Sequence, residues 1–294
     1  MPMHNDPTIN YPDYTWPEGK RCAVVFSLDL DAESPFLWMS RGKDIPYLGE
    51  IEQRRFGPRQ GLARVVRLFD DYGIKGSFYV PGIVAETYPG LLPFLVAGGH
   101  EIAHHGYFHE RIEAIASAEA EDYLQRSQEL FRAQTGLTGL GHRAPSWEMT
   151  PDFLRILQKH GVTYDSSLMG FDHPYEVEGL TELPVQWMVD DALYFRYTNS
   201  ARDKTHPASP VAVLDSWIEE FEGMRECGGL FMVTIHDWIS GRAQRIRMLR
   251  KLIEHIRSCP DVWWVRADEL AAWHAGSVNR QRFNVPAHSI NTQF

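Results

Sequence analysis

The sequence predicts an α/β protein built around a parallel β-sheet. Short apolar runs alternate along the chain with amphipathic stretches of helical period, which is the pattern of strands joined by crossover helices. The 294 residues are 44% hydrophobic and 23% charged, values typical of a compact globular protein. Because parallel α/β barrels use about 250 residues as one domain, we expect a single domain over residues 21–275. The periodicity leaves open whether the sheet closes into a barrel.

The two ends of the chain differ from this repeating pattern. Residues 1–20 hold four prolines and little periodicity, which predicts an extended arm on the surface. The tail over 276–294 has the same character. We expect both ends to pack on a neighbouring subunit of a homo-oligomer, because extended proline-rich ends seldom stabilise themselves.

Between these ends, strands and helices are expected in alternation. The run 23–28 predicts a buried strand, and apolar side chains in helical spacing over 62–69 predict a helix. Thr150 and Pro151 are typical of an N-cap and a first-turn proline, and the helix that they begin stops at Gly161. The other expected elements are a strand at 76–80, a helix at 119–134, a helix at 214–221, a strand at 230–235, a helix at 246–256 and a strand at 262–265.

The composition argues against some classes of partner. The formal net charge is −10 and the pI is near 5.7, whereas nucleic acids and anionic membranes are bound by basic surfaces. Cys22, Cys227 and Cys259 match neither a disulfide framework nor a thiolate metal site, which favours a reducing compartment. The sequence shows no secretory signal and no apolar run near the ~20 residues of a membrane span. We therefore expect a cytoplasmic protein without nucleic-acid or membrane partners.

Three carboxylates follow the first predicted strand. Asp29, Asp31 and Glu33 lie at alternate positions, so an extended backbone would point all three the same way. Functional sites of parallel α/β folds gather at the carboxyl ends of strands, and neighbouring carboxylates repel each other unless a cation or a shared proton relieves them. A solvated acidic loop is the alternative interpretation. A second cluster, of histidines, favours the functional one.

Two pairs of histidines are spaced four residues apart. His105 and His109 would present both imidazoles to one ion on a helical turn, and Gly106 permits a turn there. His100 and His104 are expected in a strand, where residues four apart lie about 13 Å apart and cannot share an ion. Because the chain has 13 histidines, about 0.6 such pairs arise by chance. Spacing alone therefore leaves both a metal site and two ordinary histidines open.

Four motifs, in order along the chain, resemble those of the polysaccharide deacetylase superfamily. The resemblance extends over about residues 20–272, and four motifs in one order are far more specific than any single motif. It implies a distorted (β/α) barrel of about seven strands, a relative of the closed α/β barrels. The motifs are Asp29-Leu30-Asp31-Ala32-Glu33, His105-Gly106-Tyr107-Phe108-His109, Arg143-Ala144-Pro145-Ser146-Trp147 and Thr234-Ile235-His236-Asp237.

The resemblance implies a role for each motif. Asp29 would be the general base and His236 the general acid, and Arg143 would keep Asp29 ionised and oriented. One divalent metal ion is implied, and we expect zinc because imidazole and carboxylate ligands suit it. An ion with three protein ligands has an open side for a water and the substrate carbonyl. The implied metal ligands are Asp31, His105 and His109.

The departures from the family pattern bear on the substrate. The widespread first motif has adjacent aspartates followed by glycine, whereas Leu30 separates the aspartates here. This form resembles the branch that contains intracellular peptidoglycan-deacetylase-like proteins, metal-dependent cyclic imide hydrolases and an allantoinase. The allantoinases of that branch depart from the paired-histidine pattern, so both histidines together favour a metal enzyme. The candidate substrate contacts are Trp147, Trp238, Tyr107 and Glu33.

Three functions are compatible with these residues. The first is a metal-dependent amidohydrolase that opens a small cyclic imide or related cyclic amide, a small-molecule substrate. We favour it because a cytoplasmic enzyme does not meet mature cell-wall polymer, and because bulky apolar walls suit a small ligand. The second is deacetylation of an N-acetylated sugar or a peptidoglycan fragment. The third, a carbohydrate-binding relative without catalysis, is disfavoured because the set of acid, base and metal ligands is complete.

Overall fold

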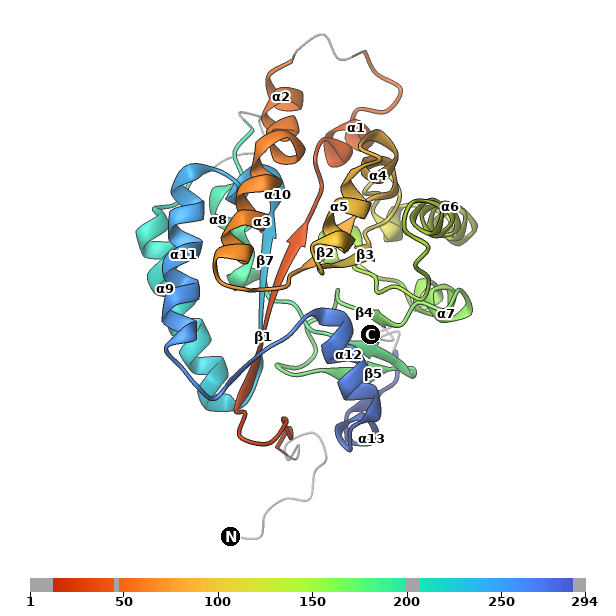
Figure 1. Ribbon diagram of the computed structural model, residues 1–294. Helices are drawn as coiled ribbons and strands as arrows, with labels where there is room; N and C mark the ends of the chain where they lie inside the picture. The colour runs from red at the N-terminus through yellow and green to blue at the C-terminus, as the bar shows by residue number, and fades with distance from the viewer. Residues whose placement is uncertain (1–12, 45–47, 199–206, 288–294) are drawn as a thin grey trace, which may run out of the picture.

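The computed structural model is an α/β fold with parallel strands at its centre and helices around them (Figure 1). It describes residues 13–44, 48–198 and 207–287. The strands are β1 (Cys22–Asp29), β2 (Ser77–Val80), β3 (Glu101–His104), β4 (Tyr164–Asp165), β5 (Tyr175–Val177), β6 (Leu180–Glu182), β7 (Leu230–His236), β8 (Val262–Trp264) and β9 (Asn284–Val285). Strand β1 lies in the middle, paired in parallel with β2, β7 and β8.

A row of parallel segments runs through the fold. Strand order is β7-β1-β2-β3, and single bridges from His104 through His142 to Asp165 continue the row to β4, which pairs in parallel with β6. Six strands and the bridge at His142 thus form a row of seven parallel segments, in line with the about seven strands expected for the distorted barrel. The distortion lies beyond β6, where β5 pairs in antiparallel fashion and β9 then adds to β5.

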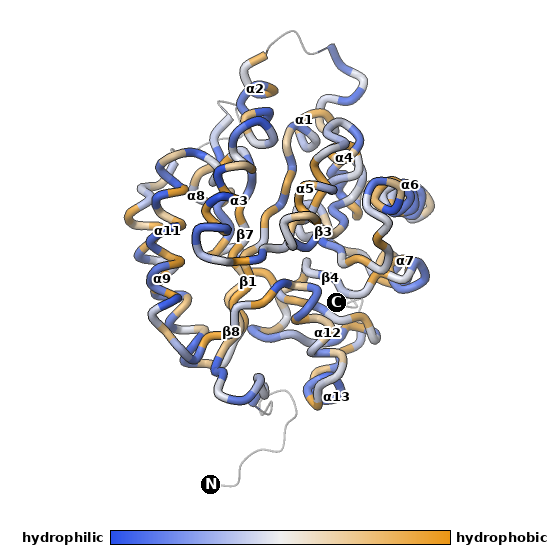
Figure 2. The backbone as a smooth tube through the Cα atoms, viewed as in Figure 1, coloured by the Kyte–Doolittle hydropathy of each residue, from blue (hydrophilic) through white to orange (hydrophobic). Residues whose placement is uncertain are grey.

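Helices cover the outside of this row, and apolar and polar residues alternate along them (Figure 2). Their buried apolar side chains belong to the same core as those of the strands. In the third helix, Val65 and Phe69 recur at helical spacing and are buried, and the Phe69 ring packs edge-on against Phe26 of β1. The helices are α1 (Ser34–Met39), α2 (Gly49–Phe56), α3 (Leu62–Asp71), α4 (Gly82–Thr87), α5 (Leu91–Ala97), α6 (Ser117–Thr135), α7 (Pro151–Lys159), α8 (Asp191–Phe195), α9 (Pro210–Cys227), α10 (Asp237–Ser240), α11 (Ala243–Arg257), α12 (Ala267–Gly276) and α13 (Asn279–Arg282). None of the described helices is long and apolar enough to cross a membrane.

Each strand and helix expected from periodicity is present, with ends shifted by a few residues. The predicted strand at 23–28 is β1, and its eight residues are all buried. The predicted N-cap of α7 is confirmed, because Oγ1 of Thr150 accepts a hydrogen bond from the N–H of Phe153 at 3.2 Å. The elements that periodicity did not show are mostly short ones, such as α1, α4 and β4 to β6, and the ten-residue α12 is the longest of them.

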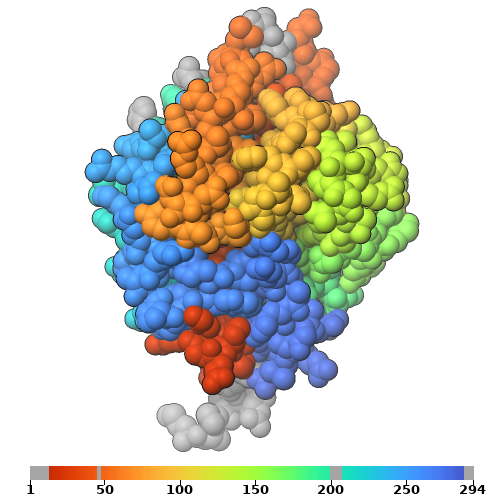
Figure 3. All heavy atoms as spheres, viewed as in Figure 1, coloured from red at the N-terminus to blue at the C-terminus, as the bar shows by residue number. Residues whose placement is uncertain are grey.

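The described parts of both chain ends pack on the body of the same subunit. Nε1 of Trp16 donates to the carbonyl O of Gly228 at 2.7 Å, and Tyr14 OH is hydrogen-bonded to Nδ1 of His274. In the predicted tail, α13 and β9 are regular elements, and β9 pairs with β5. Phe283 is fully buried and packs in one core cluster with side chains of β5 and β6. Figure 3 shows the red N-terminal residues beside the blue C-terminal helices. The outermost parts of arm and tail, 1–12 and 288–294, lie outside the described residues.

Candidate active site

The carboxyl ends of β1, β3 and β7 bring the predicted site residues together. Asp29 ends β1 and His236 ends β7, and the register of the two strands pairs these residues directly. Asp31 lies two residues beyond β1, and His105 directly follows β3. Because neighbouring parallel strands end at the same edge, residues far apart in the sequence meet there.

Asp31, His105 and His109 form a cluster with the donor set of a metal site. Oδ1 of Asp31 is 3.5 Å from Nε2 of His105 and 3.6 Å from Nε2 of His109. These separations are too long for strong hydrogen bonds, and Oδ1 of Asp31 is buried without a hydrogen-bond partner in the described part of the chain. Nδ1 of His105 donates to the carbonyl O of Arg143 at 2.8 Å, which leaves the Nε2 lone pair for an ion. These residues therefore fit a divalent transition ion.

The loop that carries His105 and His109 is an irregular turn, not the helical turn that their spacing suggested. Gly106 has a φ of 67° and His109 a φ of 61°, and the two imidazole rings meet with their centres 5.0 Å apart. The carboxylate of Glu110 braces the turn by accepting hydrogen bonds from the N–H groups of Tyr107 and Phe108. Glycine at position 106 is required because a left-handed residue with little room comes at low cost only without a side chain.

The other histidine pair remains outside this cluster. His104 ends β3 and His100 precedes the strand, which confirms the strand interpretation of the pair. The N–H of Gly76 donates to Nδ1 of His100 at 3.1 Å, and that ring packs edge-on against Phe78. The His104 ring packs against Phe131 of α6. The two rings therefore have separate surroundings and share no ion site.

A buried ion pair joins the first and third motifs. Nη1 of Arg143 donates to Oδ1 of Asp29 at 2.7 Å, while Nε and Nη2 donate to the carbonyl O and Oγ of Ser166, both at 3.0 Å. The guanidinium lies 3.9 Å from the ring centre of Tyr79. A buried charge is stable only when charged or hydrogen-bonding partners surround it, and Asp29 and Ser166 provide these partners for the Arg143 guanidinium. The pair fixes Oδ1 of Asp29 and leaves Oδ2 facing the metal cluster, 3.9 Å from Nε2 of His105.

His236 is held by an aspartate that the sequence did not single out. Nδ1 of His236 donates to Oδ1 of Asp191 at 2.7 Å, and the backbone N–H of His236 donates to Oδ2 of the same residue at 3.0 Å. Nε2 of His236 is 3.8 Å from Oδ2 of Asp31. Asp190 lies farther away, with Oδ1 3.9 Å from Nδ1 of His236, and caps α8 through the N–H of Ala192.

Burial and charge set different protonation states within a small space. Burial disfavours the charged form of His236, but the carboxylates of Asp191 and Asp190 outweigh it and raise the pKa of His236 well above its usual value. Burial lowers the pKa of His109 to about 4, so its imidazole is neutral and can bind an ion. Burial alone would raise the pKa of Asp31, yet the neighbouring imidazoles, His109 foremost, lower it below its usual range. The site thus combines a carboxylate and a neutral imidazole with a protonated one.

A pocket of about 210 Å³ opens onto the cluster. Trp147 and Trp238 line it. Trp187 forms the rim: it is 47% exposed and packs on Trp147 with ring centres 4.4 Å apart. Arg54 of α2 is only 4% exposed, lies over the Trp238 ring at 4.6 Å and is paired with Glu50 at 3.1 Å. The pocket is therefore walled by aromatic rings, with the buried guanidinium of Arg54 beside them.

Two of the four candidate substrate contacts do not line this pocket. Tyr107 is buried elsewhere, and its OH donates to Glu86 at 2.6 Å. Glu33 accepts hydrogen bonds from Tyr88 OH at 3.0 Å and pairs with Arg55 at 3.2 Å. The expected alternation of carboxylates ends after Asp31, because Ala32 has a φ of 46° and turns the chain out of the extended conformation.

Several pocket residues carried no clear signal in the sequence. The neighbouring aspartates 190 and 191 look like an ordinary helix N-cap, which Asp190 indeed is. Trp187 and Arg54 lie in segments without recognisable motifs, far from the metal ligands in the sequence. Glu110 could have been found, since an acid directly after a paired-histidine motif with glycine is placed to brace the turn.

The fold and the grouping of acidic and histidine side chains at its strand ends are those of a metal-type hydrolase, and comparison with known proteins identifies the family. The family model described as polysaccharide deacetylase matches residues 56–164. A peptidoglycan deacetylase of Helicobacter pylori is 31% identical over 283 residues, covering 86% of this chain and 96% of that protein. The chain therefore belongs to the polysaccharide deacetylase family. A peptidoglycan deacetylase-like protein of Gibberella zeae is 25% identical over 296 residues, covering 87% of each chain.

Solved structures confirm the fold. A crystal structure named as a candidate polysaccharide deacetylase from Mycobacterium smegmatis superposes with a TM-score of 0.85 at 31% identity, covering 97% of this chain and 100% of that chain. An allantoinase gives a TM-score of 0.77 at 21% identity, with 90% and 94% coverage, a likeness that shows the fold alone. The predicted distorted (β/α) barrel of the polysaccharide-deacetylase type is thereby confirmed.

Proposed function

We propose that this protein is a metal-dependent hydrolase of a non-peptide carbon–nitrogen bond and that its substrates are small cyclic imides or related cyclic amides. Family membership supports the class of bond. The observation that most supports the substrate class is the pocket beside the metal-type cluster, about 210 Å³ with two tryptophan walls. This volume is below the roughly 300–1,000 Å³ of common ligand pockets and suits one small ring better than a length of polymer.

The proposed metal site consists of Asp31, His105 and His109, and we propose zinc as the ion. When bound, the ion would make the substrate carbonyl more electrophilic and the attacking water more acidic. Asp29 would take the proton of that water on Oδ2, because Arg143 occupies Oδ1.

The proposed general acid is His236. Asp191 holds Nδ1 and favours the protonated ring, so Nε2 can give a proton to the leaving nitrogen. The balance is one water added across the carbon–nitrogen bond. An imide yields a carboxylic acid that still carries an amide, whereas an N-acetyl sugar yields acetate and an amine.

The second candidate is deacetylation of an N-acetylated sugar or a peptidoglycan fragment. The similarity to the Helicobacter pylori protein, which spans nearly its whole length, supports this candidate. The half-exposed ring of Trp187 at the rim also offers a face on which a sugar could stack. Both candidates use the same base and metal ligands, and they differ in how strongly the leaving nitrogen needs an acid.

Two variants distinguish the candidates. Asp29→Asn should lower kcat/KM for either substrate class by the ~10²–10⁴-fold typical of general catalysis. An imide nitrogen between two carbonyls leaves as a stabilised anion, so His236→Ala should impair turnover of succinimide or dihydrouracil much less than Asp29→Asn does. For chito-oligomers both variants should be comparably impaired. An undiminished rate in Asp29→Asn with metal still bound would remove Asp29 as the base.

The remaining proposals concern the whole chain. We propose one catalytic domain over 21–275 between the arm, 1–20, and the tail, 276–294, in a cytoplasmic homo-oligomer that binds neither nucleic acid nor membrane. The acidic charge of −10 supports the proposal that nucleic acid and membranes are not partners. The lack of a disulfide framework in the sequence supports the cytoplasmic location. A monomeric mass by light scattering would dispose of the oligomer.

A further inference from the structure

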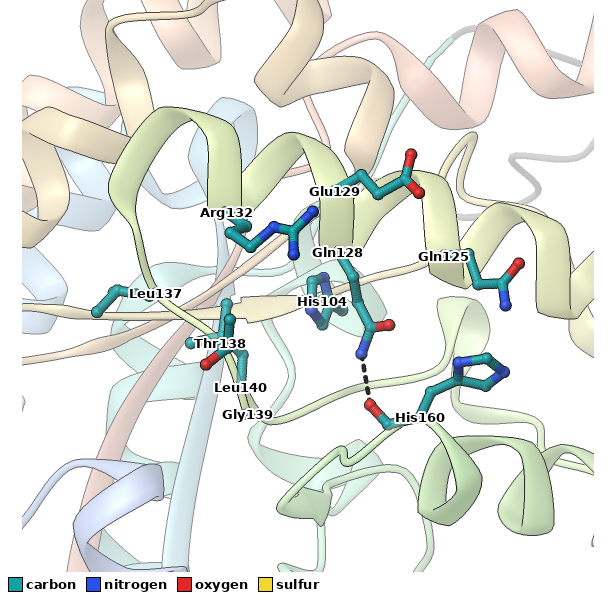
Figure 4. Close-up of a pocket in the computed structure, with 10 residues that line it drawn as sticks. All are labelled: His104, Gln125, Gln128, Glu129, Arg132, Leu137, Thr138, Gly139, Leu140 and His160. Atoms are coloured by element: carbon teal, nitrogen blue, oxygen red, sulfur yellow. Dashed lines mark hydrogen bonds between the residues drawn. The ribbon is translucent and has the colours of Figure 1, made fainter.

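A second cavity lies behind the strand that carries the first histidine ligand. It is open to solvent, has a volume of about 350 Å³ and is lined by the end of β3, by α6 and by residues 137–140 (Figure 4). We call it the side cavity. His104, the neighbour of His105, contributes to its wall, and successive residues at the end of a strand face opposite sides. The side cavity and the metal pocket share no lining residue.

The side cavity contains polar groups whose hydrogen-bonding capacity is unmet by the described residues. His104 is 2% exposed, and its buried Nδ1 has no partner there. An unsatisfied buried polar atom costs about 1–3 kcal/mol, so the His104 ring is an unpartnered polar group in the wall of the cavity. Arg132 of α6 lines the same cavity with an exposed side chain, and its guanidinium has no hydrogen-bond or ion-pair partner among the described residues, so it is free to pair with a ligand.

The rest of the wall limits the charge and shape of a ligand. Nε2 of Gln128 donates to the carbonyl O of His160 at 2.9 Å, a bond that joins α6 to the end of α7 and is drawn in Figure 4. Glu129 lines the same wall as Arg132, so the cavity has one cation and one anion. A second negative charge on a ligand would face Glu129, which favours a monoanion over a dianion.

We propose that the side cavity binds a small monocarboxylic acid that also carries an amide or hydroxyl group. The carboxylate pairs with Arg132, and the second group hydrogen-bonds with the His104 ring, which as a neutral imidazole has one donor and one acceptor. The acid–amide left by opening a cyclic imide has this composition. That link to the enzyme's product rests on the proposed function, whereas the binding of such an acid does not.

An occupied side cavity would act on the segment that carries the active-site residues. The backbone N–H of His104 donates to Gly141 O, and the carbonyl O of His104 accepts from the N–H of Arg143, both at 2.9 Å. A ligand that fixes His104 therefore steadies the backbone beside both His105 and Arg143. We expect product acid to alter kcat at concentrations that fill the cavity.

The probe is succinamate, titrated calorimetrically into the full-length metal-loaded protein. Arg132→Met should weaken binding at least tenfold. The matched control is Arg155→Met, which removes an exposed arginine of α7 that is paired only with Asp152 in the described chain and should leave the affinity unchanged. Asp31→Asn, which alters the metal pocket, should also retain the affinity. Equal affinity in Arg132→Met and wild type overturns the proposal, as does binding that disappears in Asp31→Asn.

The two proposals can fail separately. If succinamate binds as described but no cyclic imide is hydrolysed, the side cavity stands and the proposed substrate class does not. If imides are hydrolysed and Arg132→Met binds succinamate like wild type, the side cavity is refuted and the proposed function is untouched.

Discussion

Replacing Asp191 by asparagine tests the role of His236 directly, because the change removes a charge and almost no volume. Both carboxylate oxygens of Asp191 accept hydrogen bonds from His236, at 2.7 Å from Nδ1 and 3.0 Å from the backbone N. An asparagine side chain can keep only one of these two acceptors. A hydrogen bond to a charged group contributes about 1.5–3 kcal/mol, and one pKa unit corresponds to about 1.4 kcal/mol. The loss of this stabilisation should therefore lower the pKa of His236.

The sign of the pH effect follows from the role of an acid. Asp191 raises the pKa of His236, so the protonated imidazole persists as the pH rises and is lost only above that pKa. In Asp191→Asn the alkaline limb of the rate profile should therefore move to lower pH. On that limb, kcat/KM for an N-acetyl sugar should drop about 10- to 100-fold. Turnover of an imide should drop much less.

Asp190→Asn is the matched control. Oδ1 of Asp190 lies 3.9 Å from Nδ1 of His236, beyond hydrogen-bond reach, and an asparagine there can still cap α8. We expect its alkaline limb to move far less than that of Asp191→Asn. If Asp191→Asn keeps the wild-type limb with normal metal content, the carboxylate does not sustain the acid form of His236 and the reasoning is refuted.

Three further substitutions test the metal ligands, the loop and the rim. His105→Ala should abolish bound metal in elemental analysis and His100→Ala should retain it; equal metal content in both would reject the ligand assignment. Gly106→Ala should lower metal content and melting temperature, because at a φ of 67° the new Cβ would lie 2.8 Å from a carboxylate oxygen. Gly136→Ala, with a φ of 76° and open space, should cost only the ~1–2 kcal/mol of a left-handed residue in urea unfolding, so an equal loss in both variants would contradict the steric argument. Trp187→Ala should raise KM about tenfold at nearly constant kcat, since it removes ground-state contact; an unchanged KM for succinimide and for chito-oligomers alike would show that the rim does not touch substrate.

The fold was predictable wherever one physical signal dominated. The strand at 23–28 is an unbroken apolar run, and a strand buried on both faces requires such a run. The helices α3 and α11 have apolar stripes wide enough to fix both their period and their inward face. Short strands such as β4 have only two residues, too few to establish a period of any kind.

The candidate site was predictable where residues lie directly beyond a strand. Asp29 and His236 end apolar strands and His105 directly follows β3, so strand order alone brings them to one edge. Asp191 reaches the same place from the start of a short helix, and its sequence neighbours explain it fully as part of a cap. Its contact with His236 depends on tertiary packing, which no local pattern encodes.

The errors of sequence reasoning concentrate where the backbone departs from regular conformations. Among the described residues, five other than glycine have positive φ, and Ala32, His109, Ser146 and Trp147 of that set lie in the three amino-terminal motifs. Each such residue costs on the order of 1–3 kcal/mol and persists only where the surrounding packing fixes it. At Ala32 the strain ends the alternation that would have pointed Glu33 into the site; at His109 it replaces the helical turn. Rules of side-chain spacing assume a regular backbone. Around this site the backbone departs from regular strand and helix conformations, which brings together side chains that those conformations would keep apart.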